Sequence, residues 1–201
     1  MNTDREIIRL SLDAPSAFAE LFERHARVIG AFAARRVGSD AAQDVLSETM
    51  LVAFRRRADF DDTWESAKPW LLGIASRVMK KHRADEARQW RSFEASVFRG
   101  DHVSDGAIEQ AAARADASAA VRALAPRIAA LGVRDRETLL LYAWGDLTYE
   151  EVAVALGVPV GTVRSRLNRV RRRLAPPGSK SSARLTWIAK EETDGAYGTS
   201  A

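Results

Sequence analysis

Cysteine is absent from this 201-residue chain, and glycine and proline are scarce, with 12 and 6 copies. Without thiols the chain forms no disulfides and no thiolate metal sites, which is typical of proteins from a reducing compartment. Scarce glycine and proline, abundant alanine and only short β-branched runs favour helices over sheets. The composition therefore predicts an all-α fold.

Long hydrophobic runs are missing as well. No segment approaches the roughly 18–20 consecutive apolar residues of a membrane span, and residues 1–6 (MNTDRE) contain acids and lack the apolar stretch of a secretory signal. We therefore expect a cytoplasmic protein without membrane insertion. Hydrophobic residues still make up 46% of the sequence, which is enough for a folded core.

The sequence offers no recognisable catalytic or cofactor site. Its three histidines, His25, His82 and His102, lie far apart and lack metal-ligand spacing. No glycine-rich phosphate loop and no Ser-His-Asp arrangement is indicated. We therefore predict no enzymatic activity, no cofactor and no metal site.

Basic residues are concentrated near the C-terminus, although the net charge of the whole chain is only +4. Residues 152–189 contain no Asp or Glu and carry eight Arg and Lys. Such an excess favours binding to a polyanion such as DNA, and a solvated basic face has the same charge pattern.

A helix-turn-helix pattern lies within this basic segment. Thr148 and Glu151 match a capping box, and Gly157 is suited to end the helix that follows. A second helix is then expected after residues 158–160, with four inward apolar residues: Val163, Leu167, Val170 and Leu174. Its outer charge is nearly all of one sign, whereas a solvated amphipathic helix usually interleaves acids and bases. The pattern therefore favours DNA binding over a plain surface helix.

The N-terminal half predicts a compact domain of three helices. Apolar residues at three- and four-residue spacing predict helices at 16–37, with Ser16 as the N-cap, and at 41–57. Residues 60–68 lack periodicity and are predicted to form a loop. Pro69 then suits the first turn of a third helix at 69–88.

Two sets of motifs resemble one known family. Residues 134–141 (RDRETLLL), 147–153 (LTYEEVA) and 157–167 (GVPVGTVRSRL) are similar to region 4 of the extracytoplasmic-function (ECF) group of sigma-70 factors. Residues 18–22 (FAELF), 44–48 (DVLSE) and 69–75 (PWLLGIA) resemble region 2 of the same group. The matches span about 16–175 in the order of the family.

The resemblance implies an RNA polymerase sigma factor that binds core RNA polymerase and directs promoter recognition, DNA melting and transcription initiation. It also implies two small helical domains. Region 2 is expected at 12–91, a linker at 92–116, region 4 at 117–175 and a flexible C-terminal tail at 176–201. We hypothesise that the tail is regulatory, because it extends past the usual end of region 4.

Functional residues follow from the same resemblance, position by position. Asp44 and Glu48 are expected to contact core polymerase, the alternative being ordinary surface carboxylates. Among the expected −10 contacts, Thr63, Glu65 and Ser66 offer hydrogen bonds to a flipped base. Trp64 either stacks on that base or covers the core. Arg77, Lys80 and Lys81 are expected to follow the backbone of the strand. The expected −35 contacts are Arg164, Ser165, Asn168 and Arg169 on base edges and Thr162, Arg166 and Arg173 on phosphates.

The partners implied are core RNA polymerase, promoter DNA and an anti-sigma factor. A stand-alone helix-turn-helix regulator that binds duplex DNA as a dimer is the alternative. It would account equally well for the C-terminal half, but it leaves the region 2 resemblance unexplained.

Overall fold

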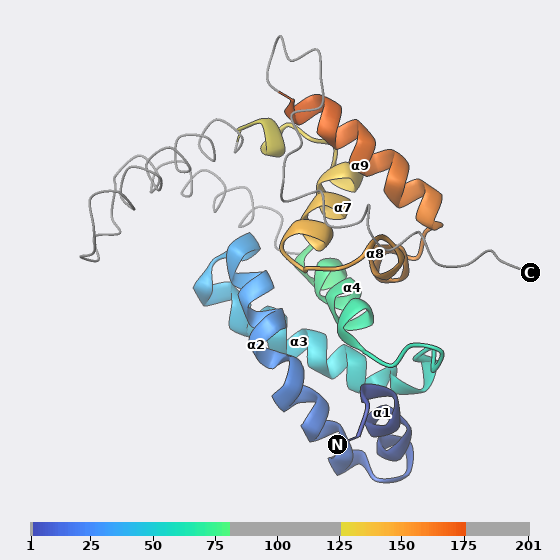
Figure 1. Ribbon diagram of the computed structural model, residues 1–201. Helices are drawn as coiled ribbons and strands as arrows, with labels where there is room; N and C mark the ends of the chain where they lie inside the picture. The colour runs from blue at the N-terminus through green and yellow to red at the C-terminus, as the bar shows by residue number, and fades with distance from the viewer. Residues whose placement is uncertain (1, 81–125, 176–201) are drawn as a thin grey trace, which may run out of the picture.

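The computed structural model describes residues 2–80 and 126–175, and all regular structure within these two segments is helical, as the composition predicted. The first segment contains α1 (Asp4–Asp13), α2 (Phe18–Val37), α3 (Ser39–Arg55) and α4 (Lys68–Met79), with single 3-10 turns at Pro15–Ala17 and Arg57–Asp59. The second contains α7 (Val133–Ala143), α8 (Tyr149–Leu156) and α9 (Val160–Leu174). Figure 1 shows these as two helical groups that meet at α4. None of the described helices is both long enough and apolar enough to span a bilayer.

Helix α1 was not predicted from the sequence. Its N-terminus is closed by a capping box, in which Glu6 N–H donates to Thr3 Oγ1 over 3.3 Å and Thr3 N–H donates to Glu6 Oε2 over 2.7 Å. Ile7 and Ile8 on its inner face are 1% and 3% exposed. The helix is therefore part of the folded core, and not a loose extension ahead of it.

The boundaries of α2 and α3 differ slightly from the predicted ones. The prediction that Ser16 caps α2 is wrong, because Pro15–Ala17 forms a 3-10 turn and Ala17, which has no side-chain hydrogen bond, occupies the N-cap position. Gly38 ends α2 with a positive φ of 87°, which glycine adopts without strain. Since α3 starts directly afterwards, the two long helices pack as an antiparallel hairpin.

The helix-turn-helix prediction is confirmed in its details. The Thr148–Glu151 capping box is formed, and Gly157 ends α8 in the left-handed conformation with φ 65°. The four inward residues predicted for α9 are all buried: Val163, Leu167, Val170 and Leu174.

The two helical groups share one hydrophobic core. Buried residues from α1–α4 and from α7–α9 form a continuous cluster, and α8 packs on α4 so closely that a Cβ on Gly73 would lie 2.4 Å from the carbonyl oxygen of Ala155. Next to this contact, Arg36 of α2 forms a buried bidentate ion pair with Glu137 of α7. Two domains joined by a linker were expected from the sequence, which contains no local sign of this packing. The predicted linker, the predicted tail and Lys81 lie outside the described residues.

Candidate nucleic-acid interface

Helix α9 presents a polar surface opposite its buried residues. At 3.6 residues per turn, Ser165, Asn168 and Arg172 point away from the line of Val163 and Leu167. All three are exposed. Arg172 is not among the predicted contacts, although its spacing of seven residues from Ser165 places both on the same helical line. This line of α9 is therefore open to a partner.

Three arginines on this surface have no partner within the described parts of the chain. The side chains of Arg164, Arg172 and Arg173 are exposed and make no hydrogen bond or ion pair there. Helix α9 contains six arginines and no acid. Its positive potential is therefore not neutralised along this line, which suits a polyanionic ligand.

Two other predicted −35 residues are held against α7. Arg169 Nη1 donates to both carboxylate oxygens of the buried Asp135, over 2.9 and 3.3 Å. Arg166 Nη1 donates to Thr138 Oγ1 over 3.4 Å. For Arg169 to reach a base edge it would have to leave a buried carboxylate without its partner, which is costly. These contacts favour Arg169 as a residue that fixes α9 on α7.

The remaining polar groups of α9 are ordered by local hydrogen bonds. Ser165 Oγ donates to the carbonyl of Thr162 over 2.9 Å. Asn168 Oδ1 accepts from Arg171 Nη1 over 3.1 Å, which leaves the Asn168 amide group to donate. Arg171 Nη2 also donates to the Tyr149 hydroxyl over 2.8 Å, so this arginine links α9 to α8.

The predicted −10 loop precedes α4 and is internally hydrogen-bonded. Asp61 Oδ1 accepts from the backbone N–H and from the hydroxyl of Thr63, over 3.1 and 2.8 Å. Glu65 is exposed, whereas Trp64 is half-buried. The loop thus has a defined conformation and keeps some of its polar groups accessible.

A small cavity of about 80 Å³ lies beside this loop. It is rich in aromatic walls, and the Phe60 and Trp70 rings meet edge to face with centroids 5.3 Å apart. The lining residues are Asp59, Phe60, Asp61, Trp64, Ser66, Pro69, Trp70 and Val154. Because Val154 belongs to α8, the second helical group forms part of this cavity in the present arrangement.

The residues predicted to track the −10 strand lie at the end of α4. Arg77 and Lys80 are both exposed. Arg77 Nη2 donates to the Ala155 carbonyl over 3.4 Å, so this side chain also touches α8.

The predicted core-binding carboxylates lie together on α3. Asp44 is exposed and Glu48 is half-buried, one helical turn apart. Leu51, the next residue along the same face, is 47% exposed despite being apolar. Glu48 also lines an open groove of about 200 Å³ between α3 and α4, together with Val52, Arg56, Ile74, Arg77 and Val78.

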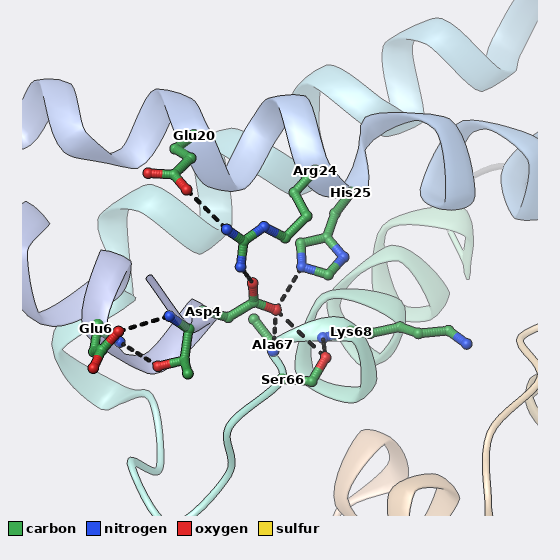
Figure 2. Close-up of polar contacts among 9 residues, drawn as sticks. Asp4, Glu6, Glu20, Arg24, His25, Ser66, Ala67 and Lys68 are labelled. Atoms are coloured by element: carbon green, nitrogen blue, oxygen red, sulfur yellow. Dashed lines mark hydrogen bonds and ion pairs between the residues drawn. The ribbon is translucent and has the colours of Figure 1, made fainter. Parts of the chain in front are cut away.

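Behind the predicted −10 loop lies a buried carboxylate that the sequence did not indicate. Asp4, at the start of α1, is 4% exposed and lies among groups from α2 and from the residues just before α4 (Figure 2). His25 Nε2 lies 2.6 Å from its Oδ2, and Arg24 Nη1 lies 2.7 Å from its Oδ1. Burial alone would raise the pKa of Asp4, but hydrogen bonds from His25, Ala67 and Arg24 outweigh it and lower the pKa from its usual 3.8 to about 2. Asp4 is therefore a carboxylate at any physiological pH.

Within residues 2–80 and 126–175, no group of three or more His, Cys, Asp or Glu side chains is arranged to hold a metal ion. The exposed cationic line on α9 and the loop before α4 are the features with the clearest binding chemistry there.

Comparison with known proteins finds a family match for each of the two helical groups. The family model "Sigma-70 region 2" matches residues 21–89, and "Sigma-70, region 4" matches residues 122–174. Among curated relatives, "RNA polymerase sigma factor CarQ" of Myxococcus xanthus is 30% identical over 158 residues, covering 78% of this chain and 86% of that protein. "ECF RNA polymerase sigma factor SigL" of Mycobacterium tuberculosis is 31% identical over 150 residues, covering 74% of this chain and 81% of that protein.

A solved structure has the same fold. That structure, of CnrH in complex with the cytosolic domain of CnrY, gives a TM-score of 0.57 at 23% identity and covers 85% of this chain and 94% of the matched one. The likeness supports the all-helical architecture expected from the sequence.

Proposed function

The chain belongs to the ECF group of sigma-70 RNA polymerase sigma factors, and on this premise we propose that α9 reads the −35 element, that the loop before α4 captures a −10 base and that α3 docks on core RNA polymerase. The observation that carries the proposal is the exposed outer surface of α9, where Arg164, Arg172 and Arg173, which have no side-chain partner within residues 2–80 and 126–175, accompany Ser165 and Asn168. The rest of the chain supplies the surfaces that a promoter-specificity factor needs. It has no catalytic role of its own, because the polymerase performs the chemistry.

The outer line of α9 suits the major groove of duplex DNA. A helix is about 10–12 Å wide, and the groove is about 12 Å wide. Arg164 and the Asn168 amide have the donors that recognise guanine and adenine edges, and Ser165 accommodates either. Arg172 and Arg173, nearer the C-terminal end, are placed to contact phosphates. Arg169 and Arg166 contribute charge from the flank while they hold α9 on α7.

The loop before α4 supplies groups of the kind that capture an unpaired base. Flipping a base costs a few kcal/mol of stacking, which an aromatic platform and hydrogen bonds must offset. The half-buried Trp64 offers a stacking surface beside the aromatic cavity, and Glu65 and Thr63 offer hydrogen bonds. Arg77 and Lys80 then follow the strand backbone along α4, and the predicted Lys81 continues the same sequence.

Core polymerase is the proposed protein partner of α3. Asp44, Glu48 and Leu51 follow one another at i, i+4 and i+7, so they lie on one helical face. Two carboxylates followed by an exposed leucine fit a partner surface that is basic and has an apolar patch beside it. An anti-sigma factor is a second proposed protein partner, because the family is regulated by such proteins and the similar structure of CnrH contains CnrY.

Binding of both promoter elements requires the two helical groups to separate. The −35 and −10 elements are about 25 base pairs apart, which is on the order of 85 Å at about 3.4 Å per base pair. In the present arrangement, Val154 of α8 and Trp64 of the loop line the same cavity. The polymerase-bound form must therefore differ from this arrangement by movement of α8 away from α4.

Co-elution with sigma-free core RNA polymerase tests the docking surface. We expect the wild type to co-elute stoichiometrically and the double variant Asp44→Arg, Glu48→Arg to lose this. A matched control, Asp13→Arg with Glu23→Arg, reverses two exposed acids on other elements and should bind normally. If the wild type is folded and fails to bind core polymerase, the sigma assignment of the surfaces is wrong, and the stand-alone duplex-binding regulator becomes the better account.

Variants of α9 test DNA reading. With promoters mapped for the reconstituted holoenzyme, Arg164→Ala or Asn168→Ala should relax base preference in the −35 element, with a cost of about 1–3 kcal/mol. Arg172→Ala should weaken binding to all sequences alike and lower the salt dependence by about one counterion. Equal effects of Arg164→Ala on all sequences would reassign Arg164 to the phosphates.

A further inference from the structure

The first turn of α1 holds the loop before α4 at four points. Arg5 N–H donates to the Glu65 carbonyl over 3.4 Å, and Arg5 Nη1 donates to the Asp62 carbonyl over 3.3 Å. Asp4 Oδ2 accepts from the Ala67 backbone N–H over 2.8 Å and from the Ser66 hydroxyl over 3.4 Å. Two consecutive residues of α1 thus contact four of the loop residues at 62–67.

Asp4 is itself anchored from the opposite side (Figure 2). Its carboxylate only accepts hydrogen bonds, so the His25 Nε2–H donates to it, as does Arg24, both from α2. Arg24 is held in turn by Glu20 one turn earlier, over 2.8 Å. The carboxylate therefore joins a rigid long helix to the loop, and it cannot move without breaking several charge-assisted bonds.

Ser66 is engaged in this network on both sides of its hydroxyl. The hydroxyl hydrogen is directed to Asp4, and the oxygen accepts from Lys68 N–H over 3.2 Å at the start of α4. Asp4 also lies at the N-terminal end of α4, where a negative charge is favourable. This leaves Thr63, Trp64 and Glu65 as the loop groups that remain available to a base.

We propose that Asp4 and Arg5 are positioning residues for promoter opening, which fix the loop before α4 in the conformation that receives the unpaired −10 base. The inference rests on the proposed function of that loop. The physical reason is preorganisation. The six loop residues lose their conformational entropy when the protein folds, so this loss does not weaken the later binding of DNA. Helix α1 lies ahead of residues 21–89, the segment that the region 2 family model matches, so the family match does not assign this role.

The decisive variants are Asp4→Asn, which removes the charge at nearly constant size, and Arg5→Met, which removes the side-chain contact to Asp62. Two controls match them. Glu20→Gln neutralises the other carboxylate on Arg24, which does not touch the loop, and Arg9→Met removes an exposed arginine one turn further along α1.

Amide hydrogen exchange of the full-length chain reports on the loop directly. We expect exchange of the peptide spanning residues 61–67 to be at least about tenfold faster in Asp4→Asn, with a smaller increase in Arg5→Met. Exchange in α8 and α9 should not change, and neither control should differ from the wild type. Unchanged protection of the loop in Asp4→Asn would overturn the proposal.

Holoenzyme binding to a fluorescein-labelled single-stranded −10 oligonucleotide, taken from a promoter mapped with the wild type, measures the functional consequence. We expect Asp4→Asn to bind this oligonucleotide about tenfold more weakly, with normal affinity for core polymerase and for duplex −35 DNA. A parallel loss of core binding and oligonucleotide binding would make Asp4 a residue of general stability and would refute the positioning role.

Trp64→Ala separates failure of this inference from failure of the proposed function. If Trp64→Ala binds the oligonucleotide as the wild type does, the loop is not the base-capturing site, and the proposed function fails at that point. If Trp64→Ala loses binding while Asp4→Asn retains it, the loop captures the base without help from α1, and only the positioning role is wrong.

Discussion

The ion pair between Arg36 and Glu137 gives the sharpest stability prediction. Arg36 is 1% exposed and Glu137 is 7% exposed, and the two are 101 residues apart in the sequence. The guanidinium donates through Nη1 to Glu137 Oε2 over 3.1 Å and through Nη2 to the other carboxylate oxygen. Nη1 also lies 3.4 Å from Ser76 Oγ on α4, so the pair joins α2, α4 and α7.

Removing one charge from this pair leaves the other buried without its counter-charge. For Glu137→Ala we expect the free energy of unfolding to fall by about 3–5 kcal/mol, which is a large part of the roughly 5–15 kcal/mol of a whole domain. The double variant Arg36→Met, Glu137→Leu removes both charges and fills the space with apolar groups. It should lie within about 1 kcal/mol of the wild type, or be more stable.

Urea denaturation followed by far-UV circular dichroism measures these differences from the shift of the midpoint. Glu150→Ala, which removes an exposed carboxylate from α8, is the matched control and should change stability by less than about 0.5 kcal/mol. A cost below about 1 kcal/mol for Glu137→Ala, or a double variant destabilised as much as Glu137→Ala, would refute a buried ion pair between the two helical groups.

Three further predictions concern single side chains. Because the pKa of Asp4 is lowered on folding, its carboxylate contributes about 2 kcal/mol to stability above pH 4, and this contribution is lost as the pH falls from about 4 to 2. The stability difference between the wild type and Asp4→Asn, measured in acid denaturation curves, should therefore shrink over that range. Gly73→Ala should lower the free energy of unfolding, measured with urea, by about 1–3 kcal/mol, because its Cβ would meet the Ala155 carbonyl at 2.4 Å. Gly161→Ala has nothing within 4 Å of its Cβ and should raise the free energy of unfolding by up to about 1 kcal/mol through helix propensity. Equal effects of the two variants would contradict the close packing of α4 on α8. Thr49 is fully buried, and its hydroxyl has no hydrogen-bond partner among the described residues, so Thr49→Val should raise the melting temperature, and a clear decrease would indicate a partner for the hydroxyl.

The local features of the fold were predictable because their signals are adjacent in the sequence. The Thr148–Glu151 capping box and the left-handed Gly157 need only nearby residues, and both are formed as predicted. Helix α1 carried the same kind of signal, since Thr3 and Glu6 also have capping-box spacing and two isoleucines follow. Because this signal is local, helix α1 was predictable on the same grounds as α8.

The contacts between distant elements could not be predicted in this way. Arg36 continues the apolar face of α2 at helical spacing from Ile29 and Phe32, which favours its burial, but no local pattern identifies Glu137 as its partner. The ion pair of Arg169 with Asp135 is a second contact that no local pattern indicated. The assignment of Arg169 to the −35 element, which came from the resemblance, stays a prediction. The residue types indicated the chemistry of the site, and tertiary packing decides which of them remain available for it.

Transcription by sigma-free core RNA polymerase supplemented with this chain tests the central claim most directly. On fragmented genomic DNA, with the 5′ ends of the transcripts sequenced, we predict initiation at a defined set of sites that share two upstream elements. This activity should be lost with Asp44→Arg, Glu48→Arg and kept with the Asp13→Arg, Glu23→Arg control. A folded chain that neither joins the core enzyme nor directs initiation at any site would contradict the account.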